Sequence, residues 1–475
     1  MENTRFYWHD YETFGTDPRR DWPMQFAGVC TDANFNPISE PLTLYCQPPS
    51  DCLPQPDACV ITGITPQLAA EKGVCEAEFI KTIHQQFIQP NTCVLGYNSL
   101  RFDDEVTRNS LYRNFYDPYE REWKNNNSRW DLIDVVRAAR ALRPEGVNWV
   151  DDENGKPSFK LERLTKANGI AHESAHDALS DVYATIAIAK LIKQAQPKLY
   201  DFLFLHRGKQ AVNSLLQLGT FEPLVHISGM YPATKGCLTI VLPLCPHPTN
   251  TNGVIVYDLS SDPAPLLELT AKEISQRLFT ATADLPEGIE RIPLKTVHIN
   301  KCPVLAPLKV LGENDQLRLN IDLEGCLENA KRIKNAPSIT HKLIDVFTRI
   351  YEPETNPDLM IYSGGFFSGT DKAAMTKIRN SSIDKLAALK PQFQDKRLAE
   401  MFFRYKARNY PQTLSEEEKQ RWHIFCQHKL TDNEAGASLT VTEYRQRLTE
   451  LKTEGTADKK CLEALEAYLD RRLAL

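Results

Sequence analysis

The chain has 475 residues, of which 42% are hydrophobic, 9% aromatic and 25% charged, and its formal net charge is −6. This composition excludes a disordered chain, and the length predicts two or three domains with packed cores. The acidic balance excludes indiscriminate attraction to nucleic acid, so a nucleic-acid site would require local clustering of Lys and Arg.

The sequence carries no signal for export or for a membrane. MENTRFYWHDYETFG has no basic region followed by an apolar one, and no stretch reaches the ~18 apolar residues of a membrane span. The 12 cysteines form no C-x-x-C pair, and the closest set, Cys46, Cys52 and Cys59, has no His at zinc-ligand spacing. We therefore expect a soluble, cytoplasmic protein with no membrane partner and with buried free thiols.

The first 196 residues alternate strand-like and helix-like segments. The short, turn-rich connections between the first three strands favour antiparallel neighbours. The pattern predicts an α/β domain with a mixed sheet flanked by helices. Strands are expected at residues 5–11, 25–31, 42–46 and 92–97, and helices at 76–88, 103–112 and 174–194.

Two further domains are expected after Pro197, which ends the last of these helices. In residues 197–350, β-forming residues concentrate at 223–231, 237–244 and 253–259 and helical stretches follow, which predicts an α+β domain. The polar segment 351–358 indicates a linker, and the pattern from there to residue 475 is helical and highly charged.

Acidic residues in two segments have the arrangement of metal ligands. Asp10 and Glu12 are two residues apart on a predicted strand, so both side chains point to one face among bulky apolar neighbours. A divalent cation such as Mg²⁺ would relieve their repulsion and lost solvation, although a solvated strand end explains this pair alone equally well. Asp103 falls in the first turn of a predicted helix, where an acid is also favoured simply as a cap.

A third segment, HESAHDALSD, contains His-x₄-Asp in two overlapping registers, His172/Asp177 and His176/Asp181. Ser174 and Asp177 fit a capping box, so a helix is expected to begin there and Asp181 to border its core-facing stripe. Because Asp177 is then accounted for as a cap, the second register is preferred. One such pair is weak evidence, since about one is expected by chance in a chain with 11 histidines.

The combination of the three segments is more informative than any one of them. Four carboxylates and one histidine are what two-metal phosphodiester cleavage requires. Two ions about 3.5–4 Å apart stabilise the attacking and leaving oxygens. A histidine with a pKa near neutrality takes a proton from the attacking water.

The segments HDYETFG, GYNSLRFDDE and HDALSD resemble the motifs of the exonuclease superfamily with four acidic residues and a histidine, whose fold is like that of ribonuclease H. The family writes its third motif His-x-Ala-x-x-Asp, which settles the register on His176 and Asp181. By position, the resemblance implies His176 as the general base and Glu12 as a catalytic residue as well as a ligand. The metal ligands it implies are Asp10, Glu12, Asp103 and Asp181.

Further segments, among them LPQPDACVITGITP, SRWDLIDVVRA, LTKANGI, PLVHISGM and HINKCPVLA, are similar to the bacterial exonuclease I family. The resemblance implies a ribonuclease H-like domain at 1–196, an SH3-like domain at 197–350 and a helical C-terminal domain at 351–475. It implies processive 3′→5′ removal of 5′-mononucleotides from single-stranded DNA, in repair and recombination. Two Mg²⁺ ions, with Mn²⁺ as a substitute, and a monomer are expected.

The resemblance also implies binding residues. Lys160 stands where the family has an arginine near the substrate phosphate, which keeps the charge but loses bidentate contact. Arg137 could equally be a surface ion-pair residue, and Tyr119 and Trp123 could be packing residues. Arg143 is expected to contact the acidic tail of single-stranded DNA-binding protein. The expected nucleic-acid contacts are Arg108, Tyr119, Trp123, Arg137, Lys160, Ser174, Phe366 and Phe367.

The distribution of charge provides an independent test. Between Lys372 and Arg408, ten Lys and Arg face three acids, a local charge of +7 in an acidic protein. Aromatic residues are interleaved, as in a groove for single-stranded nucleic acid, although a helical domain with an aromatic core gives the same pattern. We expect some of each, with Phe402 or Phe403 in the core and one of the glycine-flanked Phe366 and Phe367 stacked on a base.

Three other functions are compatible with parts of the sequence. A ribonuclease of the same superfamily has the same motifs, because the metals contact phosphate rather than sugar, and only the two extra domains argue for DNA. A non-catalytic scaffold for single strands or their binding protein predicts a lost metal ligand, whereas all four acids and the histidine are present. A phosphomonoesterase would not need the long basic segment.

Overall fold

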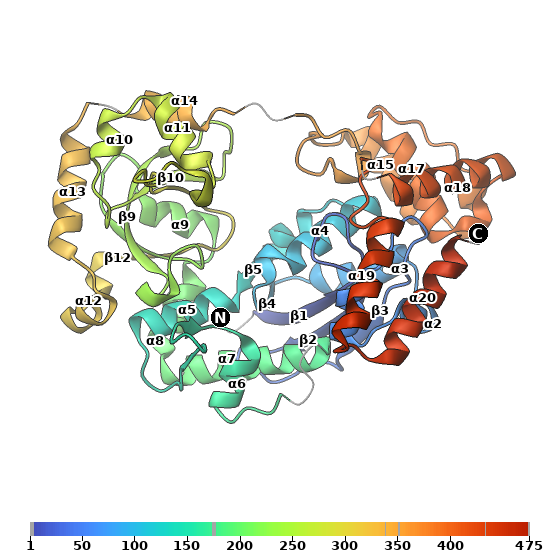
Figure 1. Ribbon diagram of the computed structural model, residues 1–475, viewed down its shortest axis with the longest axis horizontal. Helices are drawn as coiled ribbons and strands as arrows, with labels where there is room; N and C mark the ends of the chain where they lie inside the picture. The colour runs from blue at the N-terminus through green and yellow to red at the C-terminus, as the bar shows by residue number, and fades with distance from the viewer. Residues whose placement is uncertain (1–3, 173–176, 338, 350–351, 433, 474–475) are drawn as a thin grey trace. The chain divides into compact units, whose positions relative to one another are not determined.

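The computed structural model describes residues 4–172, 177–337, 339–349, 352–432 and 434–473 (Figure 1). Within it the chain forms two compact units. The first contains residues 1–128, 172–186 and 352–475, and the second contains residues 129–171 and 187–351. The N-terminal α/β segment therefore contributes to both units, and the C-terminal helices belong to the same unit as the first strands.

The first unit is built on a mixed sheet whose central strand is β1 (Arg5–Thr13). β2 (Pro23–Thr31) pairs with it antiparallel and β3 (Leu42–Tyr45) follows at the edge, while β4 (Thr92–Gly96) pairs parallel on the other side. Every residue of β2 is buried, because both faces of the sheet are covered. β5 (Ser128–Asp131) follows where the chain passes into the second unit. The predicted mixed sheet with antiparallel first strands is confirmed.

Helices of the N-terminal segment pack on this sheet. The rings of Tyr7, Phe26, Phe79 and Phe87 form the centre of one core, between the sheet and the helix that carries Phe79 and Phe87. These helices are α1 (Pro56–Thr62), α2 (Pro66–Lys72), α3 (Glu76–Phe87), α4 (Asp103–Arg113) and the first half of α7 (Ala178–Ala195).

The C-terminal helices complete the same unit and share its cores. Figure 1 shows α20 beside α2, and Tyr444 and Leu465 are buried in one cluster with Phe14 and Trp22. A second shared cluster joins Phe115 to the aromatic side chains of α17. These helices are α15 (Gly369–Arg379), α16 (Ile383–Ala388), α17 (Arg397–Asn409), α18 (Glu416–Thr431), α19 (Val441–Glu454) and α20 (Lys459–Leu473).

The second unit contains a five-stranded antiparallel sheet in the order β11-β10-β9-β8-β12. The strands are β8 (Leu224–Ile227), β9 (Leu238–Pro246), β10 (Gly253–Asp258), β11 (Leu294–His298) and β12 (Val304–Pro307). The other elements are α5 (Leu132–Leu142), β6 (Val150–Asp151), β7 (Pro157–Ser158), α6 (Leu161–Ala167), the second half of α7, α8 (Pro197–Leu205), α9 (Lys209–Leu216), α10 (Ala264–Glu268), α11 (Ala271–Phe279), α12 (Glu313–Leu319), α13 (Leu323–Asn335) and α14 (Thr340–Phe347).

Several local predictions need correction. Within the β-forming stretch 223–231 the strand ends at Ile227, because the chain turns at once and Tyr231 N–H donates to the Ser228 carbonyl. β11 and β12 were not predicted, since they are short and β11 has no alternation of buried and exposed residues. The expected linker 351–358 ends in a buried residue, Asp358, which is 5% exposed.

The remaining general expectations concern thiols and membranes. All twelve cysteines are free, and ten of them are buried, which confirms the expected buried thiols. None of the helices in the described ranges combines the length and the apolar character that a membrane crossing requires.

Candidate functional site

The end of β1 presents two carboxylates on one face. Asp10 and Glu12 are partly buried, and Tyr11 between them points to the opposite face, where it is 5% exposed. The Tyr11 hydroxyl lies 2.9 Å from Thr107 Oγ1 on α4, so the intervening residue anchors β1 to that helix. The period-two geometry predicted for this strand is confirmed.

Asp181, in the first turn of α7, meets this pair. One carboxylate oxygen from each of Asp10, Glu12 and Asp181 lies within 4.8 Å of the other two, and no other group of three potential metal ligands occurs in the described part of the chain. The structure thus brings three of the four predicted ligands together in one cluster. Carboxylate oxygens at this spacing suit a hard divalent cation.

The electrostatics of the cluster favour a bound cation. Burial raises the pKa of Asp10 well above its usual value, and the charges of Asp103, Glu12 and Asp181 raise it further. Burial also raises the pKa of Glu12 to about 8, followed by the charges of Asp181 and Asp103. Without a counter-ion, protonation of Glu12 and Asp10 is thus favoured, whereas a divalent cation favours their ionised forms. The donor set is therefore one that could hold a divalent cation.

Asp103 is the first residue of α4, as the sequence predicted. Its side chain is 4% exposed, and its Oδ1 accepts a hydrogen bond from the Tyr11 backbone N–H at 3.2 Å. It lies outside the group of three that shares one 4.8 Å sphere, yet its charge raises the pKa of both Asp10 and Glu12. Asp103 is thus next to the cluster and held there by the backbone of β1.

The segment that precedes α7 is described only in part. His176 and Ser174 lie outside the described residues, and so does the expected capping box. The described helix begins at Ala178, and Asp177 caps it by accepting from Ser180 N–H at 3.2 Å. His172 Nε2 lies 2.5 Å from Asp181 Oδ1, a contact that neither of the two sequence registers contained.

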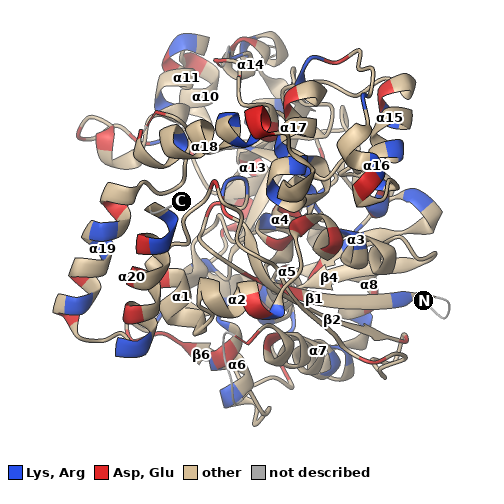
Figure 2. Cartoon of the chain, turned by 90° about the vertical axis from the view of Figure 1, so that its right-hand side faces the viewer, with Lys and Arg blue, Asp and Glu red and all other residues tan. Residues whose placement is uncertain are grey.

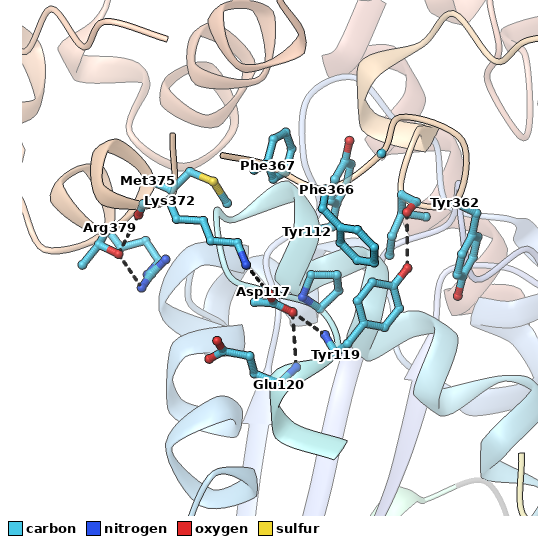
Figure 3. A pocket seen from close by; sticks show the side chains of 14 residues that line it. Tyr112, Asp117, Tyr119, Glu120, Tyr362, Phe366, Phe367, Lys372, Met375 and Arg379 are labelled. Carbon is cyan, nitrogen blue, oxygen red and sulfur yellow. Dashed lines mark hydrogen bonds and ion pairs between the residues drawn. The ribbon is translucent and has the colours of Figure 1, made fainter. Parts of the chain in front are cut away.

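An aromatic pocket lies elsewhere in the first unit (Figure 3). It has a volume of about 270 Å³, and Tyr119, Phe366 and Phe367 line it together with Lys372 and Arg379. Phe366 is 88% exposed, and Phe367 lies parallel to the Tyr112 ring at 6.0 Å. Trp123, although not in the pocket, is 64% exposed. Four of the predicted contacts therefore present aromatic surface in this unit.

Arg108 has a different environment from these aromatic residues. It is 3% exposed, and its guanidinium donates to Glu122 at 2.7 and 3.0 Å and to Glu105 at 2.9 Å. A further bond reaches the Tyr362 hydroxyl at 3.1 Å. The side chain is thus enclosed by protein partners, and one of them, Tyr362, lines the aromatic pocket and was not singled out from the sequence.

Three predicted binding residues belong to the second unit. Arg137 is mostly buried and pairs with Asp134 at 2.7 Å, which is the ion-pair alternative considered from sequence. Lys160 is exposed and precedes the first residue of α6. Arg143 is 44% exposed in its side chain, lies 3.5 Å from Asp315 and donates to the Val310 carbonyl at 3.2 Å.

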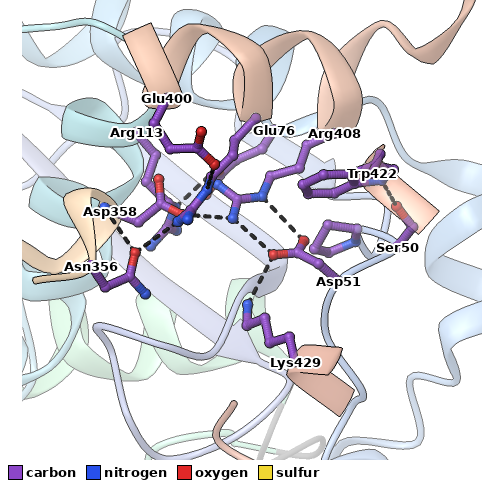
Figure 4. A network of polar contacts seen from close by, with 12 residues as sticks. Ser50, Asp51, Glu76, Arg113, Asn356, Asp358, Glu400, Arg408, Trp422 and Lys429 are labelled. Atoms are coloured by element: carbon purple, nitrogen blue, oxygen red, sulfur yellow. Dashed lines mark hydrogen bonds and ion pairs between the residues drawn. The ribbon is translucent and has the colours of Figure 1, made fainter. Parts of the chain in front are cut away.

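Several cations of the basic segment are held in ion pairs, among them Arg408, which lies between Asp51 and Asp358 (Figure 4). Arg404 and Arg408 pair with Asp358 at 2.9 and 2.7 Å, and Arg408 also pairs with Asp51 at 2.8 Å. Lys406 pairs with Glu418 at 2.7 Å. The local charge of +7 is therefore wrong as a measure of surface charge, because several cations are neutralised inside the unit. The exposed ones are Lys372, Lys377, Lys385, Lys390 and Lys396.

The aromatic residues of the same segment pack in cores, which confirms the expectation for Phe402 and Phe403 but gives no groove-lining aromatic here, since Phe393 also packs against a core. Phe402, Phe403 and Tyr405 are 8%, 5% and 4% exposed and belong to the cores. Figure 2 shows acidic and basic segments interspersed along α19 and α20, so these helices form no uniformly basic face.

The mixed sheet, the acid-x-acid pair on its central strand and the third carboxylate from α7 define a metal-dependent nuclease of the exonuclease class. The sequence matches the family model described as Exonuclease over residues 7–189. It also matches the Exonuclease I SH3-like domain over residues 207–349 and the Exonuclease I C-terminal domain over residues 355–472. The chain belongs to the exonuclease I family.

Individual relatives agree with this assignment over almost the whole chain. Exodeoxyribonuclease I of Escherichia coli K12 is 51% identical over 423 residues, 89% of each chain, and that of Haemophilus influenzae is 47% identical over 473 residues, 98% of each. The crystal structure of E. coli exonuclease I with a dA16 oligonucleotide superposes with a TM-score of 0.95 at 48% identity, covering 99% of this chain and 100% of that one.

Two further structures bear on metals and partners. The zinc-bound E. coli exonuclease I complex with single-stranded DNA has a TM-score of 0.94 at 48% identity, and an SSB/exonuclease I structure with the inhibitor CFAM has a TM-score of 0.91 at 47% identity; both cover 99% of each chain. The predicted nuclease fold with SH3-like and C-terminal helical domains is confirmed.

Proposed function

We propose that this protein is an exodeoxyribonuclease that removes 5′-mononucleotides processively from the 3′ end of single-stranded DNA. The observation that carries the proposal is the cluster of Asp10, Glu12 and Asp181 within 4.8 Å, in a chain about half identical to exodeoxyribonucleases I along most of its length. Raised pKa values for Asp10 and Glu12 support a metal-loaded working state.

The roles of the site residues follow from their chemistry. Asp10, Glu12 and Asp181 would hold two Mg²⁺ ions, or Mn²⁺ in their place, and Asp103 would join them from the start of α4. The bound cations would polarise the scissile phosphate and stabilise developing negative charge. His176 is assigned by resemblance as the base that takes the proton of the attacking water.

The strand would follow aromatic and basic side chains. Trp123 and Phe366 offer exposed ring surface on which bases stack in a sequence-tolerant way, and the half-buried Phe367 and Tyr119 line the adjoining pocket. Lys160, which is exposed, is assigned to a phosphate, and so by resemblance is Arg137, which would exchange Asp134 for the phosphate. Ser174 is assigned to the strand by resemblance alone. Arg108 could reach the strand only by leaving its ion pairs, so we assign it to the support of Tyr119, over whose ring it lies at 5.4 Å.

A protein partner is also proposed. An SSB/exonuclease I structure exists for a relative 47% identical to this chain. We assign Arg143, whose side chain is 44% exposed, to the acidic C-terminal tail of single-stranded DNA-binding protein. We also propose that the protein is a monomer and that it acts in DNA repair and recombination. Single-stranded DNA arises as an intermediate in both processes.

The decisive experiment compares four substrates. Purified protein is incubated with 5′-labelled single-stranded DNA, the matching duplex, the matching RNA and a strand blocked at its 3′ end, in Mg²⁺ and in EDTA. We expect shortening of the single-stranded DNA from its 3′ end in Mg²⁺ only, with 5′-mononucleotides as products. Duplex, RNA and the blocked strand should survive.

The other outcomes lead to different assignments. Degradation of RNA at the same rate would make the protein a ribonuclease of the same superfamily. Binding of single-stranded DNA with no cleavage under any metal would leave the scaffold as the leading account. Release of inorganic phosphate without shortening would indicate a phosphomonoesterase.

A further inference from the structure

We propose that Arg121 is a positioning residue for the metal site: its buried guanidinium, paired with Asp104, fixes the first turn of α4 and thereby the neighbouring ligand Asp103. Arg121 belongs to a short helical turn at Glu120–Glu122, which follows α4 in the chain. The inference rests on the proposed function, because it assigns Asp103 to metal binding. Neither Arg121 nor Asp104 belongs to the cluster described above.

The ion pair itself is fully enclosed. Arg121 Nη2 lies 2.6 Å from Asp104 Oδ1, and the two side chains are 0% and 3% exposed. The guanidinium carbon also lies 5.2 Å from the centre of the Phe87 ring. Asp104 is adjacent in sequence to Asp103, and both are in the first turn of α4, so a shift of one moves the other.

The buried pair of Arg121 with Asp104 is an unfavourable means of stabilising the fold. Arg121 Nε and Nη1 have no hydrogen-bond partner among the described residues, although both are buried. A buried guanidinium with unsatisfied donors costs free energy, and hydrophobic residues of similar volume are often as stable as a buried pair. The arrangement therefore calls for a role beyond stability.

That role follows from how α4 is held. β1 fixes one side of the helix, because Tyr11 N–H donates to Asp103 and the Tyr11 hydroxyl contacts Thr107 one turn later. The Glu120–Glu122 turn fixes a second side, because Arg121 pairs with Asp104 and Glu122 pairs with Arg108, again one turn later. Two pairs of contacts thus set the position of α4 along and around its axis.

Asp103 is the ligand for which this position matters most. It lies outside the group of three carboxylates that share one 4.8 Å sphere, whereas Asp10 and Glu12 are fixed by the pairing of β1 with β2. A small displacement of α4 therefore decides whether Asp103 can join a bound cation. Arg108 is a weaker point of control, since Glu105 and Tyr362 also hold it.

The test measures metal binding directly. Mn²⁺ binding to the full-length protein is followed by electron paramagnetic resonance, beside the Mg²⁺ dependence of cleavage and the affinity for single-stranded DNA in EDTA. Partners that orient metal ligands typically change metal affinity by about 10–100-fold when removed. We expect R121Q to weaken Mn²⁺ binding by about tenfold or more and to raise the Mg²⁺ requirement equally, with DNA affinity in EDTA unchanged.

Three companion variants separate positioning from folding. R121K keeps the cation and should recover most of the Mn²⁺ affinity. The double variant R121Q/D104N leaves no unpaired charge, so it should be more stable than R121Q yet still bind Mn²⁺ weakly. R113Q breaks the matched pair of Arg113 with Glu76, 2.6 Å apart and equally buried at the other end of α4, and should lose stability without loss of Mn²⁺ affinity.

The outcomes distinguish this inference from the proposed function. If D103N binds Mn²⁺ weakly, Asp103 remains a metal ligand. In that case, wild-type Mn²⁺ affinity in R121Q, or an equal loss of Mn²⁺ affinity in R113Q, would overturn the role of Arg121. Wild-type Mn²⁺ affinity in D103N would instead remove Asp103 from the metal site, and the inference would fall with that assignment.

Discussion

Among single residues, Asp10 and Asp181 have the clearest expected effect. Each of the two residues contributes a carboxylate oxygen to the cluster, and a bound cation would contribute several kcal/mol of transition-state stabilisation. Because about 4 kcal/mol corresponds to roughly a thousandfold in rate, D181A should lower kcat by ~1000-fold or more while single-stranded DNA is still bound. Single-turnover cleavage and fluorescence anisotropy measure the two properties separately.

Asp177 provides the control for this substitution. It lies in the same segment and caps α7 through Ser180 N–H, but it is not in the cluster of three. Since asparagine caps helices as well as aspartate does, D177N should retain both stability and cleavage. A D177N protein as inactive as D181A would show that the segment, rather than the Asp181 carboxylate, is what cleavage requires.

A second prediction concerns pH and stability. The pKa of Glu12 in the metal-free protein is about 8, above its usual 4.5, so the folded protein binds more protons than the unfolded chain between these values. Stability contributed by the protonated carboxyl is therefore complete below pH ~4.5 and is lost as pH rises toward 8. In EDTA, the melting temperature should fall over this range.

Two comparisons identify Glu12 as the source of that slope. E12Q, which cannot ionise, should melt at a temperature that depends less on pH in EDTA. Saturating Mg²⁺ should reverse the trend in the unmodified protein, because metal binding displaces the protons and strengthens as pH rises. A melting temperature in EDTA that rises steadily from pH 5 to pH 8 would contradict the electrostatic account of the cluster.

The residue scale also shows what sequence could and could not establish. Asp10 and Glu12 followed from strand periodicity, and Asp181 followed from helix patterning together with a family motif. The contact of His172 with Asp181 and the pair of Arg121 with Asp104 had no signal in the sequence, because they depend on tertiary approach of separate segments. Burial of Arg108 was likewise invisible, since arginine composition says nothing of the partners that enclose it.

At the scale of elements, the buried ion network around Asp51 joins the N-terminal segment to α17 and α18. Arg408 and Lys429 both pair with Asp51, at 2.8 and 2.9 Å, and Asp51 is completely buried. The two cations hold the pKa of Asp51 far below its usual range against the opposing effect of burial. Asp51 therefore remains ionised at neutral pH.

Removing that anion should be costly. In D51N, Arg408 and Lys429 would each lose a buried partner, and breaking a buried ion pair typically costs about 3–5 kcal/mol. We expect a markedly lower urea midpoint for the transition that unfolds the first unit. Tryptophan fluorescence measures this transition. Trp22, whose ring lies 5.1 Å from the Arg408 guanidinium and 5.6 Å from Lys429 Nζ, reports on this region.

D57N is the matched control for this network. Asp57 also joins an N-terminal helix to a C-terminal one, through Arg447 at 2.7 Å, but its side chain is 45% exposed. Exposed pairs contribute about 0–1 kcal/mol, so D57N should change the midpoint little. Equal effects of the two substitutions would mean that burial is not what gives the Asp51 network its strength.

The same network explains why the charge of the basic segment misled. Counting side chains between Lys372 and Arg408 treats each as solvent-exposed, whereas Arg404, Lys406 and Arg408 pair with acids outside that segment. Those acids are Asp358, Glu418 and Asp51, and the first and last come from segments far away in the sequence. Helical periodicity and core aromatics were predictable here because they are local properties, and the ion pairs were not.

For the whole molecule, the shared cores make the C-terminal helices an integral part of the nuclease unit. Tyr444, Leu448 and Leu465 are buried in one cluster with Phe14 and Trp22 from the N-terminal segment. The helices that follow the expected boundary at residue 351 therefore pack into cores that they share with the N-terminal segment. A chain that ended there would expose the N-terminal half of this cluster to water.

A chain truncated after residue 350 should consequently lose its cooperative fold, because each large buried side chain contributes about 1.5–3 kcal/mol and single domains are stable by only about 5–15 kcal/mol. We expect poor solubility, binding of the hydrophobic dye ANS and rapid proteolysis of residues 1–128, together with loss of cleavage. Co-expression of residues 352–475 as a separate chain should restore part of the fold, since the contacts are non-covalent. A truncated protein that unfolds cooperatively at the temperature of the full chain would show that the shared clusters contribute little, and that the C-terminal helices serve the DNA strand alone.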